Sequence, residues 1–212
     1  MNNFLCYCVT NRGRFAANLF DGTQRLFDVA LNDYSGQDFR SYPAEYFFNR
    51  KGHKWPSIAA LLPTISRKYQ AYCFLDDDVV INAADINHLF QEGIRLGFNL
   101  WQASLTWDSY EYWKFLYTQG WGIREVPLVE VMMPFFSAEA LRICLPSCAE
   151  FESGHALDQL WAQMLNWQKM VVFDQVQATH RRYPRSIYWK LSSGLTVFEE
   201  ARMLREKYCL LT

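Results

Sequence analysis

The chain has 212 residues, half of them hydrophobic, and a formal net charge of -1. This length suits one α/β domain with a substantial core, and the balanced charge argues against a general nucleic-acid binder, which needs a basic surface. No stretch approaches the roughly 20 apolar residues that cross a bilayer, and residues 1–4 do not resemble a secretion signal. We therefore expect a cytoplasmic, single-domain protein whose scattered cysteines are reduced.

The N-terminal part predicts the start of a βαβ unit. A buried strand, a helix and a second strand are indicated at residues 4–9, 15–20 and 25–31. Their order implies a parallel sheet with a right-handed crossover. The first strand ends in Thr10, Asn11 and Arg12, whose polar groups suit a nucleotide at a strand end and equally suit a plain turn.

The most informative stretch is an apolar strand that runs into three carboxylates. A helix at residues 58–65, bent by its proline, leads to a strand at residues 72–75, and Asp76, Asp77 and Asp78 follow. Three adjacent carboxylates at a sheet edge repel one another unless a cation compensates them. The hard oxygens of Asp76 and Asp78 suit Mn²⁺ or Mg²⁺ and leave coordination positions for a phosphate. An acidic turn in water is the alternative interpretation.

The middle of the chain predicts alternating helices and strands. Asn82 caps a helix that ends at Gly97, and a strand is expected at residues 99–104. Residues 107–121 are crowded with aromatic rings, which we interpret as a helix whose rings either fill the core and a lid or stack on a saccharide. Residues 126–132 predict a strand that places Glu130 on an apolar face, where its carboxylate must be paired, protonated or in use.

Two more helices are expected before the last strand. Ser137 caps the first, and Asp158 falls in the first turn of the second. The helix dipole stabilises an ionised acid at that position, and a carboxylate there can also face substrate.

A late strand at residues 171–174 leads to a basic segment with a histidine. Neutral His180 can bind Mn²⁺, and Arg182 and Arg185 can anchor a diphosphate by charge-assisted hydrogen bonds. The final segment, residues 196–208, predicts an amphipathic helix that packs on the domain or docks on a partner or a membrane surface.

In this order the elements resemble glycosyltransferases of the GT-A type, and most closely an uncharacterised plant and bacterial family, domain of unknown function 707. The resemblance rests on Lys54-Trp55, on residues 72–78, 129–137, 154–158 and 171–174, and on His180. It implies an α/β, Rossmann-like fold in which helices flank a mixed, mostly parallel central sheet. It also implies one domain, with a nucleotide-binding part at residues 1–80, an acceptor-side part at residues 98–185 and a C-terminal helix at residues 195–209.

The resemblance further implies a nucleotide-diphosphate sugar as donor, with UDP as the default nucleotide. Mn²⁺ or Mg²⁺ would be held by Asp76 and Asp78, with His180 as a third ligand, while Lys54 and Asp77 would contact the donor. The chain departs from the family after His180, where related sequences place a glycine and this one continues with arginines.

Such an enzyme transfers sugar to a saccharide or lipid-linked saccharide in polysaccharide biosynthesis. Negative charge develops on the departing diphosphate, where the metal with Arg182 or Arg185 neutralises it. An inverting reaction needs a base, for which Asp158 is the first candidate and Glu130 the second. A retaining reaction would use these acids to position the acceptor or shield the sugar.

Two alternatives belong to other classes. A metal-dependent phosphatase could use the acidic cluster, and a non-catalytic saccharide-binding or scaffold protein could keep the fold. Peripheral association with the inner face of the membrane, through the C-terminal helix, also stays open.

Overall fold

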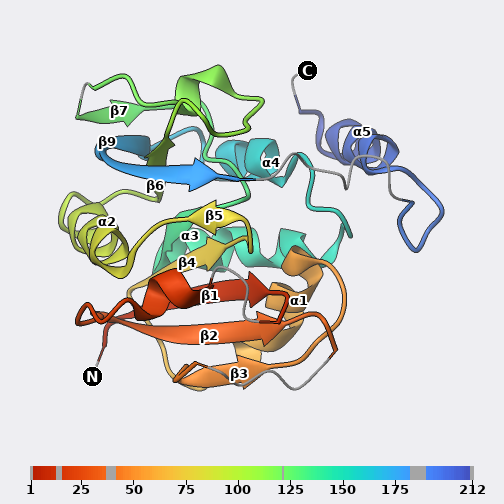
Figure 1. Ribbon diagram of the computed structural model, residues 1–212. Helices are drawn as coiled ribbons and strands as arrows, with labels where there is room; N and C mark the ends of the chain where they lie inside the picture. The colour runs from red at the N-terminus through yellow and green to blue at the C-terminus, as the bar shows by residue number, and fades with distance from the viewer. Residues whose placement is uncertain (1, 13–15, 37–41, 121, 182–189, 211–212) are drawn as a thin grey trace.

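The computed structural model describes residues 2–12, 16–36, 42–120, 122–181 and 190–210 (Figure 1). The strands in these ranges are β1 (Phe4–Thr10), β2 (Phe27–Asp33), β3 (Tyr46–Phe48), β4 (Ala71–Leu75), β5 (Val79–Val80), β6 (Leu100–Leu105), β7 (Ile123–Glu125), β8 (Phe135–Ser137) and β9 (Met170–His180). The α-helices are α1 (Lys54–Leu61), α2 (Ala83–Arg95), α3 (Ala138–Cys144), α4 (Leu157–Met164) and α5 (Val197–Tyr208). Short 3-10 helices are η1 (Ala16–Phe20), η2 (Leu62–Thr64), η3 (Lys114–Leu116) and η4 (Leu145–Ala149).

The described strands form one mixed, mostly parallel sheet in the order β3-β2-β1-β4-β8-β6-β9-β5, with β7 paired to β9. β1 runs parallel to β2 and β4, and β8 is antiparallel to both of its neighbours, so β6 runs in the same direction as β4. The arrows of β1, β2, β4 and β9 point the same way in Figure 1. Their carboxyl ends therefore share one edge, where open α/β sheets bind ligands.

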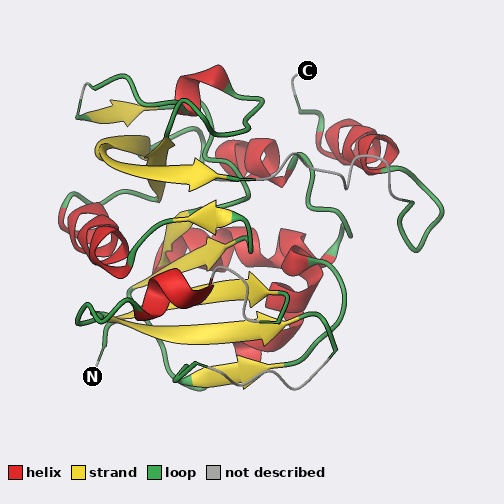
Figure 2. Ribbon diagram, viewed as in Figure 1, coloured by secondary structure: helices red, strands yellow, loops and turns green. Residues whose placement is uncertain are grey.

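Helices cover both faces of this sheet (Figure 2). On one face, Phe4 of β1 stacks on Phe90 of α2 with ring centroids 4.8 Å apart. On the other, Phe74 of β4 packs on Trp55 of α1, which meets Trp161 of α4 edge-on at 4.6 Å. Because both faces are buried, β1 and β4 read as continuous apolar runs in the sequence.

Several local predictions are confirmed. Asn82 caps α2 by accepting the N–H of Asp85 at 2.8 Å, and Ser137 caps α3 by accepting the N–H of Ala140 at 3.2 Å. The helix expected at residues 58–65 starts earlier, at Lys54, and changes to η2 at its proline. The segment expected as a helix at residues 15–20 is 3-10 over Ala16–Phe20, and the strand expected at residues 25–31 lies at Phe27–Asp33.

The strand predicted at residues 126–132 is wrong, because this segment is a loop between β7 and β8. Side chains bind its backbone in place of a neighbouring strand: the N–H of Glu130 donates to Gln102 Oε1 at 2.8 Å, and the N–H of Met132 donates to Glu130 Oε2 at 2.7 Å. Glu130 consequently does not share a strand face with its apolar neighbours, although its valine-rich sequence has strand character.

The aromatic helix predicted at residues 107–121 is also wrong for the described residues. They form a loop containing η3, in which Glu111 accepts the N–H groups of Tyr112 and Trp113 at 2.6 and 2.9 Å. A carboxylate that binds nearby backbone donors offers an alternative to helical hydrogen bonds. The segment can therefore present its rings in several directions.

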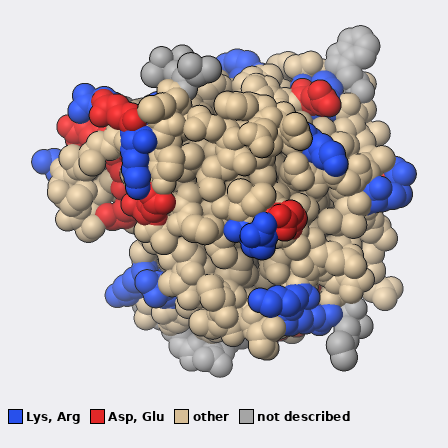
Figure 3. Space-filling model, turned by 180° about the vertical axis from the view of Figure 1, so that it is seen from behind, with Lys and Arg blue, Asp and Glu red and all other residues tan. Residues whose placement is uncertain are grey.

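The C-terminal helix α5 is confirmed and its apolar face packs on the domain. Val197, Ala201 and Leu204 are buried, while Glu200 accepts the N–H groups of Glu152 and Ser153 at 2.7 Å each. Among the described residues no helix has both the length and the apolar character to span a membrane. Viewed from behind, Lys and Arg side chains are scattered over the surface without forming a continuous basic face (Figure 3).

Candidate functional site

The first acid of the triplet is held by a lysine from another element. Asp76 leaves the end of β4, and its Oδ1 pairs with Lys54 Nζ at 2.7 Å. Lys54 lies in the first turn of α1, and its ammonium also donates to the carbonyls of Phe74, Val131 and Met132 at 3.1, 2.7 and 3.2 Å. Burial raises the pKa of Asp76, while the Lys54 charge opposes this rise. Lys54 thus links α1 with the end of β4 and with the loop at residues 126–132 that contains Glu130.

The third acid pairs with the histidine that ends β9. Asp78 Oδ1 lies 3.4 Å from His180 Nε2, and β5 pairs with β9 so that Val79 lies opposite His180. The other ring nitrogen, Nδ1, lies 2.7 Å from the carbonyl of Tyr110. Burial alone would lower the pKa of His180, but the carboxylates of Asp78 and Asp76 raise it above its ordinary value. Asp78 and His180, which are about a hundred positions apart in the sequence, are therefore neighbours in the structure.

Asp158 is a buried carboxylate, 5% exposed, in the first turn of α4. Trp113 Nε1 donates to its Oδ2 at 3.2 Å, and the N–H of Gln159 donates to its Oδ1 at 2.9 Å. Burial raises its pKa to about 6, because the ionised form loses water that these two donors replace only in part. A carboxyl group with such a pKa can accept and release a proton near neutral pH.

The charge of Asp158 acts on two further acids, Glu111 and Glu130. Burial raises the pKa of Glu130 well above its ordinary value, and the charges of Glu111 and Asp158 raise it further. Burial also raises the pKa of Glu111, on which His180 and Asp158 exert opposite effects. Asp76 contributes to the shift of Glu130 as well. These mutual effects place the acids of the triplet and those of the acceptor-side segment within charge range of one another.

Glu111 was not among the residues predicted from the sequence. The only sequence signal for it is a carboxylate within an aromatic segment, and its role as a backbone acceptor depends on the loop conformation. The aromatic pattern predicts a helix for that segment, in which Glu111 would not bind the following N–H groups.

The residues that the first strand was predicted to offer to a nucleotide, Thr10, Asn11 and Arg12, lie at the end of β1. Thr10 is buried and opposite Asp33 in the strand register, whereas Asn11 and Arg12 are exposed. Asp33 is also buried, and its Oδ2 has no hydrogen-bond partner among the described residues. A buried carboxylate oxygen at this edge is a position where a ligand hydroxyl or N–H can bind. The sequence predicts a strand end at residue 31, which leaves Asp33 in a loop, whereas β2 extends to Asp33.

The remaining predicted residues lie elsewhere. Asp77 Oδ2 accepts the hydroxyl of Tyr34 at 2.6 Å, on the β2 side of the triplet. Arg182 and Arg185 lie outside the described residues. The described part of the site therefore contains the acids, Lys54 and His180, while the predicted diphosphate contacts of the two arginines stay a prediction.

The chemistry of the acids fits a divalent metal. Asp76 and Asp78 offer hard carboxylate oxygens, and their charges act on one another. Across the described ranges, however, no three His, Cys, Asp or Glu side chains converge as metal ligands. His180 contacts Asp78 instead, so a third ligand from its imidazole requires this contact to rearrange. The two carboxylates are the ligands that the present arrangement provides.

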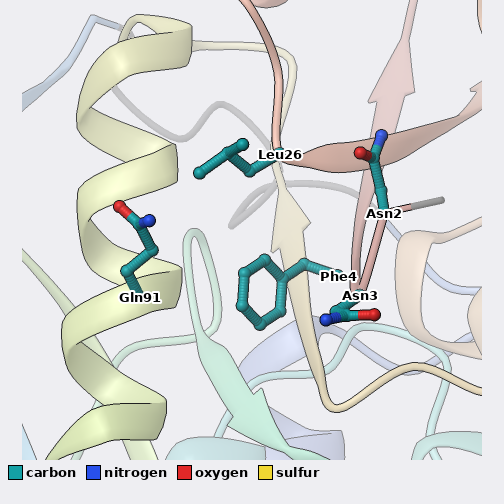
Figure 4. Close-up of a pocket in the computed structure, with 5 residues that line it drawn as sticks. All are labelled: Asn2, Asn3, Phe4, Leu26 and Gln91. Carbon is teal, nitrogen blue, oxygen red and sulfur yellow. The ribbon is translucent and has the colours of Figure 1, made fainter.

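Two hollows differ in their chemistry. One, of about 430 Å³, lies beside the start of α1 and includes Arg50, His53, Glu152 and Ser192 in its lining. The other, of about 280 Å³, lies at the amino end of β1 and is lined by Asn2, Asn3, Phe4, Leu26 and Gln91 (Figure 4). The second contains no charged side chain and lies at the edge opposite the acids, so it is not part of the candidate site.

Comparison with solved structures identifies the same fold in TarS of S. aureus, a glycosyltransferase. For TarS 1-349 in complex with UDP-GlcNAc, the TM-score is 0.61 at 15% identity, over 91% of this chain and 62% of that one. For TarS 1-349 alone, the TM-score is 0.60 at 14% identity, over 84% of this chain and 59% of that one. This chain therefore spans about three fifths of the TarS 1-349 structures.

The sequence comparisons give no match. No protein-family model matches the chain, and no curated protein is similar to it in sequence. The resemblance to domain of unknown function 707 is thus not confirmed, whereas the Rossmann-like fold with a mixed, mostly parallel central sheet is confirmed.

Proposed function

We propose that this chain is a metal-dependent glycosyltransferase that moves a sugar from a nucleotide-diphosphate sugar to a hydroxyl of a saccharide or lipid-linked saccharide. One observation carries the proposal: Asp76 and Asp78 follow β4 at the carboxyl edge of the sheet with His180 beside Asp78, and the charges of these residues and of the buried acids Glu111, Glu130 and Asp158 act on one another. The same fold in TarS, which has been crystallised with UDP-GlcNAc, supports a nucleotide-sugar donor and makes UDP the first nucleotide to test.

On the donor side, this chain would supply the metal ligands and the residues that line the nucleoside. Asp76 and Asp78 would hold Mn²⁺ or Mg²⁺, and the metal would supply positive charge for the diphosphate. Lys54 holds the Asp76 carboxylate in place from behind. Thr10, Asn11 and Arg12 at the end of β1, together with Asp33, would line the nucleoside part of the donor. Asp77 would act on this side by fixing Tyr34.

On the acceptor side, Asp158 would act as the base of an inverting transfer. The acceptor oxygen forms a bond to the anomeric carbon while the bond from that carbon to the diphosphate oxygen breaks, and the electron pair leaves with the diphosphate. The acceptor proton passes to a carboxylate oxygen of Asp158, which Trp113 orients. Burial raises the pKa of Glu130 well above its ordinary value, so its carboxyl group is better suited to hold a proton and donate it to the acceptor in a hydrogen bond.

Thermal unfolding with UDP, GDP, ADP and CDP, each with Mn²⁺, Mg²⁺ or a chelator, tests the donor side without knowledge of the acceptor. A ligand that binds the folded state stabilises it by mass action, so we expect one nucleotide to raise the melting temperature only with metal. Asp76→Asn and Asp78→Asn should remove this increase. Glu139→Gln, which changes an exposed acid on α3, is the control that should retain it. A metal-independent increase, or one that survives both Asp variants, would contradict the proposal.

A further inference from the structure

The segment between β6 and η3 presents large aromatic rings to solvent beside the acids. Trp107 is 72% exposed and Tyr112 is 76% exposed, and Tyr110 between them is also exposed. The other large exposed hydrophobic side chains among the described residues are spread over several elements: Leu96, Trp167, Phe198 and Met203. Concentrated exposure of apolar surface marks a binding site more often than scattered exposure does.

Hydrogen bonds fix this segment to the sheet, so its rings are exposed on an ordered loop. The N–H of Thr106 donates to the carbonyl of Ala178 at 2.9 Å, and the N–H of Tyr110 donates to the carbonyl of His180 at 3.1 Å. The N–H of His180 in turn donates to Ser109 Oγ at 3.0 Å. The loop is therefore fixed to the end of β9, the same strand end that places His180 beside Asp78.

A second anchor holds the far end of the loop. Arg124 binds Asp174 through two nitrogens at 2.8 and 3.0 Å, and its guanidinium also donates to the carbonyls of Phe115 and Tyr117. Because Asp174 is buried in β9, this pair ties the loop to the sheet at a second point. A binding surface held at both ends loses little conformational entropy when it meets a ligand.

The orientation of the rings leaves flat faces available. Trp107 stacks on Tyr117 with centroids 5.2 Å apart and planes within 5°, so one indole face is covered and the other faces outward. Tyr112 meets Trp113 edge-on at 4.9 Å. Trp113 donates to Asp158, so Tyr112 and the proposed base contact the same side chain.

We propose that Trp107 and Tyr112 form the platform that binds the acceptor, and that the acceptor is a neutral pyranose saccharide. The C–H face of a pyranose ring suits an outward aromatic face, and its hydroxyls suit the carboxylates of Glu111 and Asp158. The charge of Arg181 acts on Asp108, and Lys114 Nζ lies 5.1 Å from the centroid of the Tyr117 ring on which Trp107 stacks, so cations accompany the acids of this loop and the surface has no single-sign charge to select a charged ligand. This inference rests on the proposed glycosyltransferase function, and it adds the chemical class of the acceptor and the residues that hold it.

The test measures saccharide affinity by ligand-detected NMR, with UDP and Mn²⁺ present. The probes are cellotetraose, xylotetraose and chitotetraose, with tetragalacturonate as the anionic comparison. Trp107→Ala and Tyr112→Ala should each weaken binding of the neutral probe that binds wild type by about three- to tenfold. Trp107→Phe and Tyr112→Phe, which keep a ring, should recover part of this loss. Trp167→Ala is the matched control, because Trp167 is 55% exposed and precedes the amino end of β9.

The expected pattern is weaker binding in the two loop Ala variants, partial recovery in the Phe variants and no change in Trp167→Ala. Wild-type affinity in both loop Ala variants, an equal loss in Trp167→Ala, preference for tetragalacturonate, or no saccharide binding by the wild type would each overturn the proposal. The melting temperature with UDP and Mn²⁺ is recorded for each variant and should match wild type. If none of UDP, GDP, ADP and CDP raises the melting temperature of the wild type in the presence of metal, the proposed donor chemistry is refuted separately from the acceptor platform.

Discussion

Replacing Lys54 with methionine tests whether one ammonium holds the site together. Methionine keeps most of the length of the stem but removes the charge that pairs with Asp76 and the hydrogen bonds to three carbonyls. The side chain of Lys54 is only 9% exposed. Asp76 would therefore keep a largely desolvated charge without its cation.

The magnitude follows from this geometry. Removing one partner of a buried ion pair costs about 3–5 kcal/mol, but the Asp76 side chain is 31% exposed and water screens part of its charge. We therefore expect the free energy of unfolding of Lys54→Met to fall by about 2–3 kcal/mol. For a domain of this size, that corresponds to a decrease in melting temperature of about 4–12 °C.

Urea unfolding of wild type, Lys54→Met, Asp76→Asn and the double variant completes the experiment. Because the neutral Asn leaves no charge to compensate, the double variant should be more stable than the sum of the single effects predicts, with a coupling energy of about 1–3 kcal/mol. Lys51→Met, an exposed lysine nearby, is the control. Additive effects, or a loss below about 0.5 kcal/mol in Lys54→Met, would refute the view that Lys54 supports Asp76.

Three other predictions follow from the geometry. The pKa of Asp158 is raised to about 6, so the folded state binds this proton more tightly than the unfolded state does. The contribution of Asp158 to the free energy of unfolding therefore falls by about 1–3 kcal/mol as the pH rises from about 4 to 6, and then levels off. Urea unfolding at each pH should show that Asp158→Asn removes this decrease. Gly154 has φ +77°, and an added Cβ would lie 2.3 Å from Trp55 Cδ1, so Gly154→Ala should lower the free energy of unfolding by more than about 2 kcal/mol. Gly97 has φ +72° but nothing within 4 Å of an added Cβ, so Gly97→Ala should lower it by about 1 kcal/mol. Equal losses in the two variants would contradict the steric argument. Ala156 precedes α4 at φ +70°, and Ala156→Gly should raise the melting temperature by relieving about 0.5–1 kcal/mol of backbone strain, whereas a decrease would show that its methyl packing matters more.

The parts of the fold that were predictable are those in which local pattern and burial agree. β1 and β4 are apolar because both faces of the sheet are covered, and the triplet after β4 follows directly from where that strand ends. Asn82 and Ser137 are caps whose side chains bind N–H groups three residues along the chain. Such signals depend on nearby residues alone, so the sequence carries them in full.

The loops around the acids were not predictable, because side chains from distant segments satisfy their backbone groups. Gln102 binds the N–H of Glu130, and Lys54 binds carbonyls at Val131 and Met132, so a valine-rich segment with strand character stays a loop. Lys54 was predicted as a donor-binding residue, whereas its position as a support for Asp76 depends on the packing of α1 against this loop. Tertiary hydrogen bonds override local propensity here.

The most direct test of the central claim compares donor binding and turnover in Asp158→Asn. The assay incubates the protein with Mn²⁺, a panel of sugar donors that carry the nucleotide found to stabilise it, and the neutral tetrasaccharide that binds it, and measures the nucleotide released and the product formed by chromatography. We expect transfer by the wild type and loss of at least about 100-fold of this rate in Asp158→Asn, while the UDP-dependent melting shift stays intact. A rate in Asp158→Asn equal to that of the wild type would contradict the role of Asp158 as the base. If the wild type neither binds a nucleotide nor transfers a sugar from any of the donors, the glycosyltransferase proposal itself is contradicted.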